Sequence, residues 1–213
     1  MKTAIAGGAS QSGTVIGNVY DKYGSRNPIV RWMMTGFETA LSDLVRSAAP
    51  SSIHEIGCGE GHWVLRWHAE GRNVRGCDFS SDVIDIARSN AEAVDAPTSL
   101  FSARSIYDLN PAEDHADLLV CCEVLEHLTD PEAALAALGR LKPLHLILSV
   151  PREPIWCALN LARGKYITRG GNTPGHIQHW SQTGFTRMVA RHFEIVEVRS
   201  PFPWTMLLCR PRG

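Results

Sequence analysis

The chain has few of the features that mark secreted or membrane-spanning proteins. Its six cysteines show no Cys-x-x-Cys spacing, so a zinc or redox site of that type is not predicted. No window reaches the roughly 18 consecutive apolar residues of a membrane span. Residues 1–13 also lack the apolar centre of a signal peptide. We therefore expect a cytoplasmic protein whose cysteines are buried, reduced thiols.

An excess of one charge sign is also absent. The 21 Lys and Arg residues are balanced by 22 Asp and Glu residues, and the formal net charge is -1. This balance excludes a strongly basic surface, so nucleic acid is not an expected partner, although a local basic patch is compatible with it. With 213 residues, of which 44% are hydrophobic, the chain fits one globular domain with a sizeable core.

The beginning of the chain divides into two parts. Residues 1–18 are small and polar, so they bury little apolar surface and predict a flexible arm. A single domain is expected over residues 19–213. Within Pro28–Ala48, apolar residues recur at steps of three and four, which predicts an amphipathic helix with Pro28 in its first turn.

After Pro50, short apolar runs alternate with helical patterns, which is typical of a βαβ series with buried parallel strands. The runs Phe193–Arg199 and 204–209 are separated only by a short turn with two prolines, so they predict an antiparallel pair. The other predicted strands are 52–56, 74–77, 100–103, 117–122 and 145–150, and the helices are 63–69, 81–91 and 131–141.

Residues 151–181 form an irregular insertion that is too long for an idle connection. We expect it to be a lid over the substrate. Its first part is apolar and then basic, which suits a lipid-linked, aromatic or anionic acceptor. A lid helix packed on the protein's own core is the alternative.

A glycine-rich loop and an acidic residue predict a nucleoside-containing cofactor. Gly57, Gly59 and Gly61 follow the first predicted strand, where glycine lets the backbone turn tightly and approach a ligand. A dinucleotide fingerprint would need a third glycine at position 62, where this chain has His62. Asp78 ends the second strand, where a carboxylate can accept hydrogen bonds from both ribose hydroxyls. Capping of the next helix is the alternative role.

Residues 55–61, 76–78 and 117–128 together resemble the class I S-adenosylmethionine-dependent methyltransferases. The resemblance implies an α/β Rossmann-like fold, with helices on both faces of a seven-stranded, mostly parallel sheet whose last strand is antiparallel. It also implies an enzyme that binds S-adenosylmethionine through the glycine loop and neighbouring residues. The expected contacts are Glu55, Gly57, Cys58 and Gly59 beside the methionine part, Asp78 on the ribose, and Phe79, Ser105 and Ile106 near the adenine.

Residues 27–31 and 121–127 are similar, more closely, to the O-methyltransferases of ubiquinone biosynthesis. This resemblance implies that Arg31 and Cys122 contact the cofactor. A guanidinium can clamp the methionine carboxylate with two hydrogen bonds, whereas a solvated helix arginine is the alternative. The expected reaction is methylation of a hydroxyl oxygen on an aromatic, sugar or lipid-linked small molecule. Nitrogen and carbon acceptors are the alternatives.

Glu123, Glu126 and His127 have the spacing i, i+3, i+4, so they share one face if the segment is helical. Together with His176 they form a candidate site for Mg²⁺ or Mn²⁺. The pattern also resembles the metal-dependent 2′-O-methyltransferases that modify small-RNA ends, although this chain lacks their RNA-binding domains. In the metal-free alternative, Glu123 caps the helix and His127 is an acid/base group.

His127 and His176 are also the candidate catalytic residues, because an imidazole can accept the proton of a hydroxyl acceptor. Two other classes of function use the glycine loop and Asp78 in the same way. An NAD-dependent oxidoreductase would leave Glu123, Glu126 and His127 unexplained. A non-catalytic module would bind the cofactor without transferring a methyl group.

Overall fold

A computed structural model describes residues 4–8, 10–11 and 14–212 of the chain. Its centre is a seven-stranded sheet in the order β5-β4-β3-β6-β7-β9-β8, and β9 is the strand that runs antiparallel to both neighbours. The predicted mostly parallel sheet with an antiparallel last strand is confirmed. The strands are β3 (Ser52–Ile56), β4 (Asn73–Asp78), β5 (Phe101–Ala103), β6 (Leu118–Cys122), β7 (His145–Pro151), β8 (Phe193–Arg199) and β9 (Trp204–Pro211).

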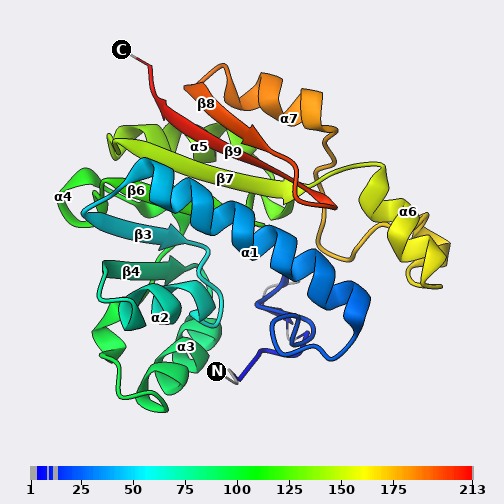
Figure 1. Ribbon diagram of the computed structural model, residues 1–213, viewed down its shortest axis with the longest axis horizontal. Coiled ribbons are helices and arrows are strands. Elements are labelled where there is room, and N and C mark those ends of the chain that lie inside the picture. The colour runs from blue at the N-terminus through cyan, green and yellow to red at the C-terminus, as the bar shows by residue number, and fades with distance from the viewer. Residues whose placement is uncertain (1–3, 9, 12–13, 213) are drawn as a thin grey trace.

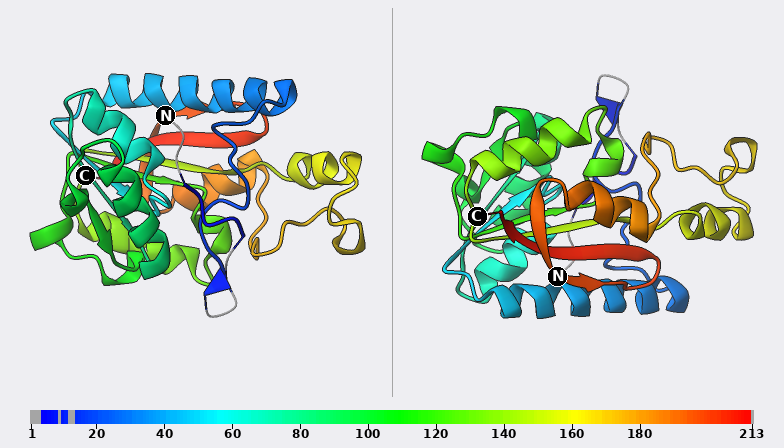
Figure 2. Two further views of the ribbon diagram at one scale, coloured as in Figure 1. Left: turned by 90° about the horizontal axis from the view of Figure 1, so that it is seen from below. Right: turned by 90° about the horizontal axis from the view of Figure 1, so that it is seen from above.

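Helices cover both faces of this sheet, as Figures 1 and 2 show. One apolar core lies between the sheet and α1, α2 and α3, and the other lies between the sheet and α5 and α7. The helices are α1 (Pro28–Ala48), α2 (His62–Ala69), α3 (Ser81–Glu92), α4 (Pro111–Asp114), α5 (Pro131–Arg140), α6 (Ile155–Ala162) and α7 (Gln182–Val189), with 3-10 turns η1 (Thr98–Leu100), η2 (Ile106–Asp108), η3 (Leu125–His127) and η4 (Ile167–Arg169).

Helix α1 has the bounds that its apolar periodicity predicts. The Asn27 side chain accepts hydrogen bonds from the backbone N–H groups of Ile29 and Val30, which caps the first turn. Leu41 and Leu44 are completely buried against the sheet. The helix therefore packs along the sheet with its N-terminal end near the carboxyl ends of the parallel strands (Figure 1).

The predicted arm, residues 1–18, lies partly outside the described residues. Where it is described, hydrogen bonds hold it on the domain. The backbone N–H groups of Ala6 and Asn18 both donate to Oε1 of Glu60, at 3.0 and 2.7 Å, and Ala4 exchanges hydrogen bonds with the Asn90 side chain. Two-residue strands β1 (Ser10–Gln11) and β2 (Thr14–Val15) pair within it.

The insertion at residues 151–181 contains α6 and η4 and extends beyond the end of the sheet (Figure 1). Asn160 is the buried residue of α6, and Leu161 on the same helix is exposed. Trp156 and Leu159 of α6 are partly buried and pack against the core, as the alternative of a packed helix expects, whereas the end of the helix is exposed. Every helix in the described part of the chain falls short of the length and apolarity that a bilayer crossing requires.

We predict that Gly61→Ala destabilises the fold more than Gly59→Ala. Both glycines have left-handed backbone angles, at φ 83° and 53°, which cost any other residue roughly 1–2 kcal/mol. A Cβ at Gly61 would also lie 2.6 Å from the Phe101 ring, whereas one at Gly59 meets no atom within 4 Å. That overlap should add roughly 1–3 kcal/mol. Urea unfolding of both variants measures the difference, and equal losses would show that Phe101 does not constrain the loop.

Candidate functional site

A cavity of about 990 Å³ opens at the carboxyl ends of the parallel strands. Its walls come from the glycine loop after β3, the ends of β4 and β6, the N-terminal half of α1, the chain before α1, and the insertion. Of the sequence-predicted site residues, those that line it are Glu55, Gly57, Cys58, Gly59, Asp78, Phe79, Ser105, Ile106, Cys122, Glu123, Glu126, His127 and His176. Residues far apart in the sequence thus share one site.

The glycine loop is held against the end of β4. The N–H groups of Gly57 and Cys58 both donate to the carbonyl oxygen of Cys77, at 2.8 and 2.9 Å. Gly59 faces the cavity, and no atom lies within 4 Å of the position that a Cβ would take there. The exposed backbone offers a cradle that fits the cofactor expected from the sequence.

Asp78 has the position expected of a ribose ligand. Its carboxylate accepts hydrogen bonds from the N–H groups of Gly59, at 3.2 Å, and Ser80, at 3.1 Å. Ser80 is the N-cap of α3, since its hydroxyl accepts from the N–H of Val83. The capping alternative for Asp78 is therefore wrong. Burial raises the pKa of the Asp78 carboxyl above its usual value.

The segment after β6 differs from the expected helix. Glu123 has a left-handed φ of 60°, and the chain then makes the single 3-10 turn η3. The Glu123 carboxylate accepts hydrogen bonds from Trp204 Nε1, at 2.7 Å, and from the Ser149 hydroxyl, at 3.3 Å. It therefore binds neighbouring side chains and caps no helix.

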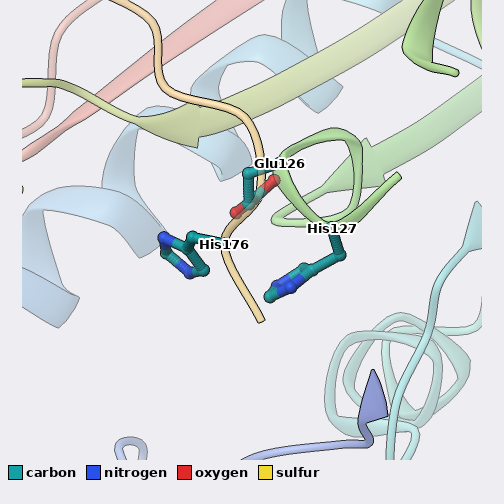
Figure 3. Close-up of side chains that lie close together, drawn as sticks. All are labelled: Glu126, His127 and His176. Atoms are coloured by element: carbon teal, nitrogen blue, oxygen red, sulfur yellow. The ribbon is translucent and has the colours of Figure 1, made fainter. Parts of the chain in front are cut away.

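Glu126, His127 and His176 come together from two segments, as Figure 3 shows. One ligand atom from each lies within 4.8 Å of the others. The backbone carbonyl of Glu126 accepts hydrogen bonds from the N–H groups of Ile177 and Gln178, which hold the returning insertion beside η3. This tertiary contact brings His176 to the site, whereas His179 lies beside Glu153.

Burial controls the charge of this cluster. Glu126 is 1% exposed, and neither carboxyl oxygen has a hydrogen-bond partner among the described residues. Burial and the nearby Glu123 raise its pKa well above the usual value. Burial lowers the pKa of His127, and burial together with His127 lowers that of His176 to about 3. Both imidazoles are therefore neutral at pH 7, the form that binds metals and accepts protons.

Arg31 is the predicted cofactor residue that the structure does not bring to the cavity. Its side chain is exposed on α1, and it is absent from the cavity lining, whereas Val30 beside it is buried and lines the wall. The helix periodicity explains this difference, because adjacent helix residues point about 100° apart. Lys22, just before α1, lines the cavity instead. No motif in the sequence marked Lys22 or the arm-binding Glu60.

Part of the chain is similar to known protein families. A model of the methyltransferase domain matches residues 53–143. A ubiquinone biosynthesis O-methyltransferase of Hydrogenovibrio crunogenus is 35% identical over 106 residues, which are 46% of this chain and 41% of that protein. Over residues 53–143 the chain therefore matches a methyltransferase domain. It spans about two fifths of the length of the curated relatives it matches.

Solved structures share the fold of this chain. Magnesium protoporphyrin IX methyltransferase from Synechocystis PCC 6803 aligns with a TM-score of 0.65 and 18% identity, covering 89% of this chain and 93% of that one. The PH0226 protein from Pyrococcus horikoshii OT3 aligns with a TM-score of 0.68 and 13% identity, covering 88% and 93%. The cavity lies where S-adenosylmethionine is expected from the glycine loop and Asp78.

We predict that Asp78→Ala weakens binding of S-adenosylhomocysteine by about 10- to 150-fold. The variant loses hydrogen bonds to a charged group, which contribute roughly 1.5–3 kcal/mol. The loss should be equal for 5′-methylthioadenosine, which retains the ribose. Isothermal titration calorimetry measures both ligands. Asp85→Ala is the matched control, because Asp85 pairs with Arg88 on the exposed side of α3. An unchanged affinity in Asp78→Ala would show that Asp78 does not bind the ribose.

Proposed function

We propose that this methyltransferase transfers a methyl group from S-adenosylmethionine to a hydroxyl oxygen of a small-molecule acceptor. The main support is one continuous cavity that joins the cofactor residues to two neutral imidazoles. The O-methyltransferase relatives agree with an oxygen acceptor. The bound cofactor would supply a methyl group on a sulfonium, so the chain must mainly orient the acceptor and receive its proton.

His127 is the better placed proton acceptor. Its Nδ1 lies 2.9 Å from the carbonyl oxygen of Gly175. Because a carbonyl only accepts hydrogen bonds, Nδ1 carries the proton and Nε2 retains a lone pair. The His176 ring packs edge-on against the His127 ring at 4.9 Å between centroids, and the Trp156 ring stacks on His176. His127 would take the hydroxyl proton, and His176 would help to orient the acceptor.

We infer that the same three residues also suit a divalent cation. Glu126 offers a buried carboxylate without a hydrogen-bond partner, and His127 and His176 offer neutral imidazoles. Two nitrogens and a carboxylate suit Mn²⁺, Fe²⁺ or Zn²⁺ more than Mg²⁺. A cation there would lower the pKa of the acceptor hydroxyl. Glu123, held by Trp204 and Ser149, would act as a neighbouring carboxylate rather than as a fourth ligand.

We predict that the protein transfers labelled methyl groups to hydroxyl compounds in a panel that also contains matched amines. His127→Ala should lower kcat by about 10²- to 10⁴-fold, the usual contribution of a general base, while the affinity for S-adenosylhomocysteine stays the same. His179→Ala, outside the cavity, is the control. Transfer to amines in preference to hydroxyls would overturn the proposal, as would full activity in His127→Ala.

For the cation, we predict that EDTA lowers activity and that Mn²⁺ restores it. Electron paramagnetic resonance of free Mn²⁺ should show one bound ion in the wild-type protein. Glu126→Gln should weaken that binding at least tenfold, because it removes the charged ligand. The control is Glu153→Gln. Glu153 belongs to a second group of possible metal ligands, with Cys157 and His179, which is more exposed than the group at Glu126. Activity indifferent to EDTA, together with no bound Mn²⁺, would leave the metal-free base as the mechanism.

A further inference from the structure

Lys22 is a half-buried cation that the proposed reaction leaves without a role. It lies between the arm and α1 and lines the cavity beside the glycine loop. Its Nζ is 5.4 Å from the centre of the Tyr23 ring. It forms no ion pair with any residue that the structure describes, at a limit of 4.0 Å. An ammonium in a partly dry cavity is costly unless an anion compensates it.

Tyr23 ties this lysine to the beginning of α2. The Tyr23 ring stacks on His62 with 3.5 Å between centroids and 8° between planes, and its hydroxyl accepts a hydrogen bond from Trp63 Nε1 at 3.1 Å. His62 and Trp63 follow Gly61 directly. These contacts hold the segment of Lys22 beside the end of the glycine loop, although Lys22 lies 35 positions before Gly57 in the sequence.

The other cations that line the cavity already have partners or lie elsewhere. Arg104 forms ion pairs with Glu113 and Asp114. Arg163 donates to the Asn160 side chain of α6 at 2.8 Å. Lys165 belongs to the insertion, and its Nζ lies 5.8 Å from the centre of the Tyr20 ring. Among the cations of the described lining, Lys22 is thus the one without an ion pair whose neighbour, Tyr23, contacts the residues that follow the glycine loop.

We propose that Lys22 binds the carboxylate of the cofactor's methionine moiety, the role that the family resemblance implied for Arg31. The inference rests on the proposed use of S-adenosylmethionine, whose methionine end is expected beside Gly57 and Gly59. An ion pair with that carboxylate would compensate the Lys22 charge, since no carboxylate among the described residues lies within 4.0 Å of it.

In a competing role, the positive charge of Lys22 would stabilise the negative charges of Glu123 and Glu126 in the same cavity. Its charge acts on Glu123 and Glu126, and opposes the rise in pKa that burial causes in both. In that case its loss would change the binding of cations at Glu126 and leave the cofactor's carboxylate unaffected. The two roles therefore give opposite results with a metal and with a carboxylate ligand.

Calorimetric titrations with two ligands test the proposal. S-adenosylhomocysteine carries the amino acid carboxylate, and 5′-methylthioadenosine lacks it. Lys22→Met should weaken S-adenosylhomocysteine binding by about 10- to 100-fold, typical of a lost charged hydrogen bond, and change 5′-methylthioadenosine binding less than twofold. Lys22→Arg should retain most of the affinity. Arg31→Met, a variant of the exposed arginine, should bind both ligands like the wild type.

The selective loss is also the check on folding, because an unfolded variant would bind neither ligand. Equal losses for both ligands would overturn the proposal in favour of a structural role for Lys22. So would unchanged S-adenosylhomocysteine binding, especially if Lys22→Met binds Mn²⁺ more tightly. A wild-type protein that binds no S-adenosylhomocysteine would instead refute the proposed function and this inference with it.

Discussion

Two hydrogen bonds to one carbonyl oxygen support the cofactor side of the cavity. The N–H groups of Gly57 and Cys58 both donate to Cys77, which joins the end of β3 to the end of β4. This junction sets the backbone of the glycine loop beside Asp78, the residue after Cys77. It also sets the start of α2, on which Tyr23 stacks. A loop without glycine at the left-handed positions would strain the backbone that makes these contacts.

The acceptor side depends on a second backbone contact, between segments about 50 residues apart. The Glu126 carbonyl receives the N–H groups of Ile177 and Gln178, so the insertion returns beside η3 after extending past the sheet. His176 is thereby placed over His127. The insertion consequently has two roles. Residues of α6 line the cavity, and the segment after α6 contributes His176 to it.

Much of the fold follows from periodicity in the sequence. The strands of buried parallel sheets are short apolar runs, and the predicted run at 52–56 has the bounds of β3. The apolar stripe of Pro28–Ala48 likewise predicts α1. The Glu123 to His127 spacing was less informative, because the helical interpretation assumed an ordinary backbone at Glu123. Its left-handed φ, supported by Trp204 and Ser149 from distant strands, ends the strand in a turn instead.

The sequence by itself determined the fold class and marked the glycine loop, Asp78, His127 and His176 as candidates, because these depend on local periodicity and on which residue types suit which chemistry. The contact between the two histidines was decided by the tertiary structure. Only the tertiary structure decided that Arg31 points to solvent while Lys22 lines the cavity, and that Glu60 holds the arm. Those choices depend on helix rotation and on contacts between distant segments, and neither leaves a spacing that the sequence can show.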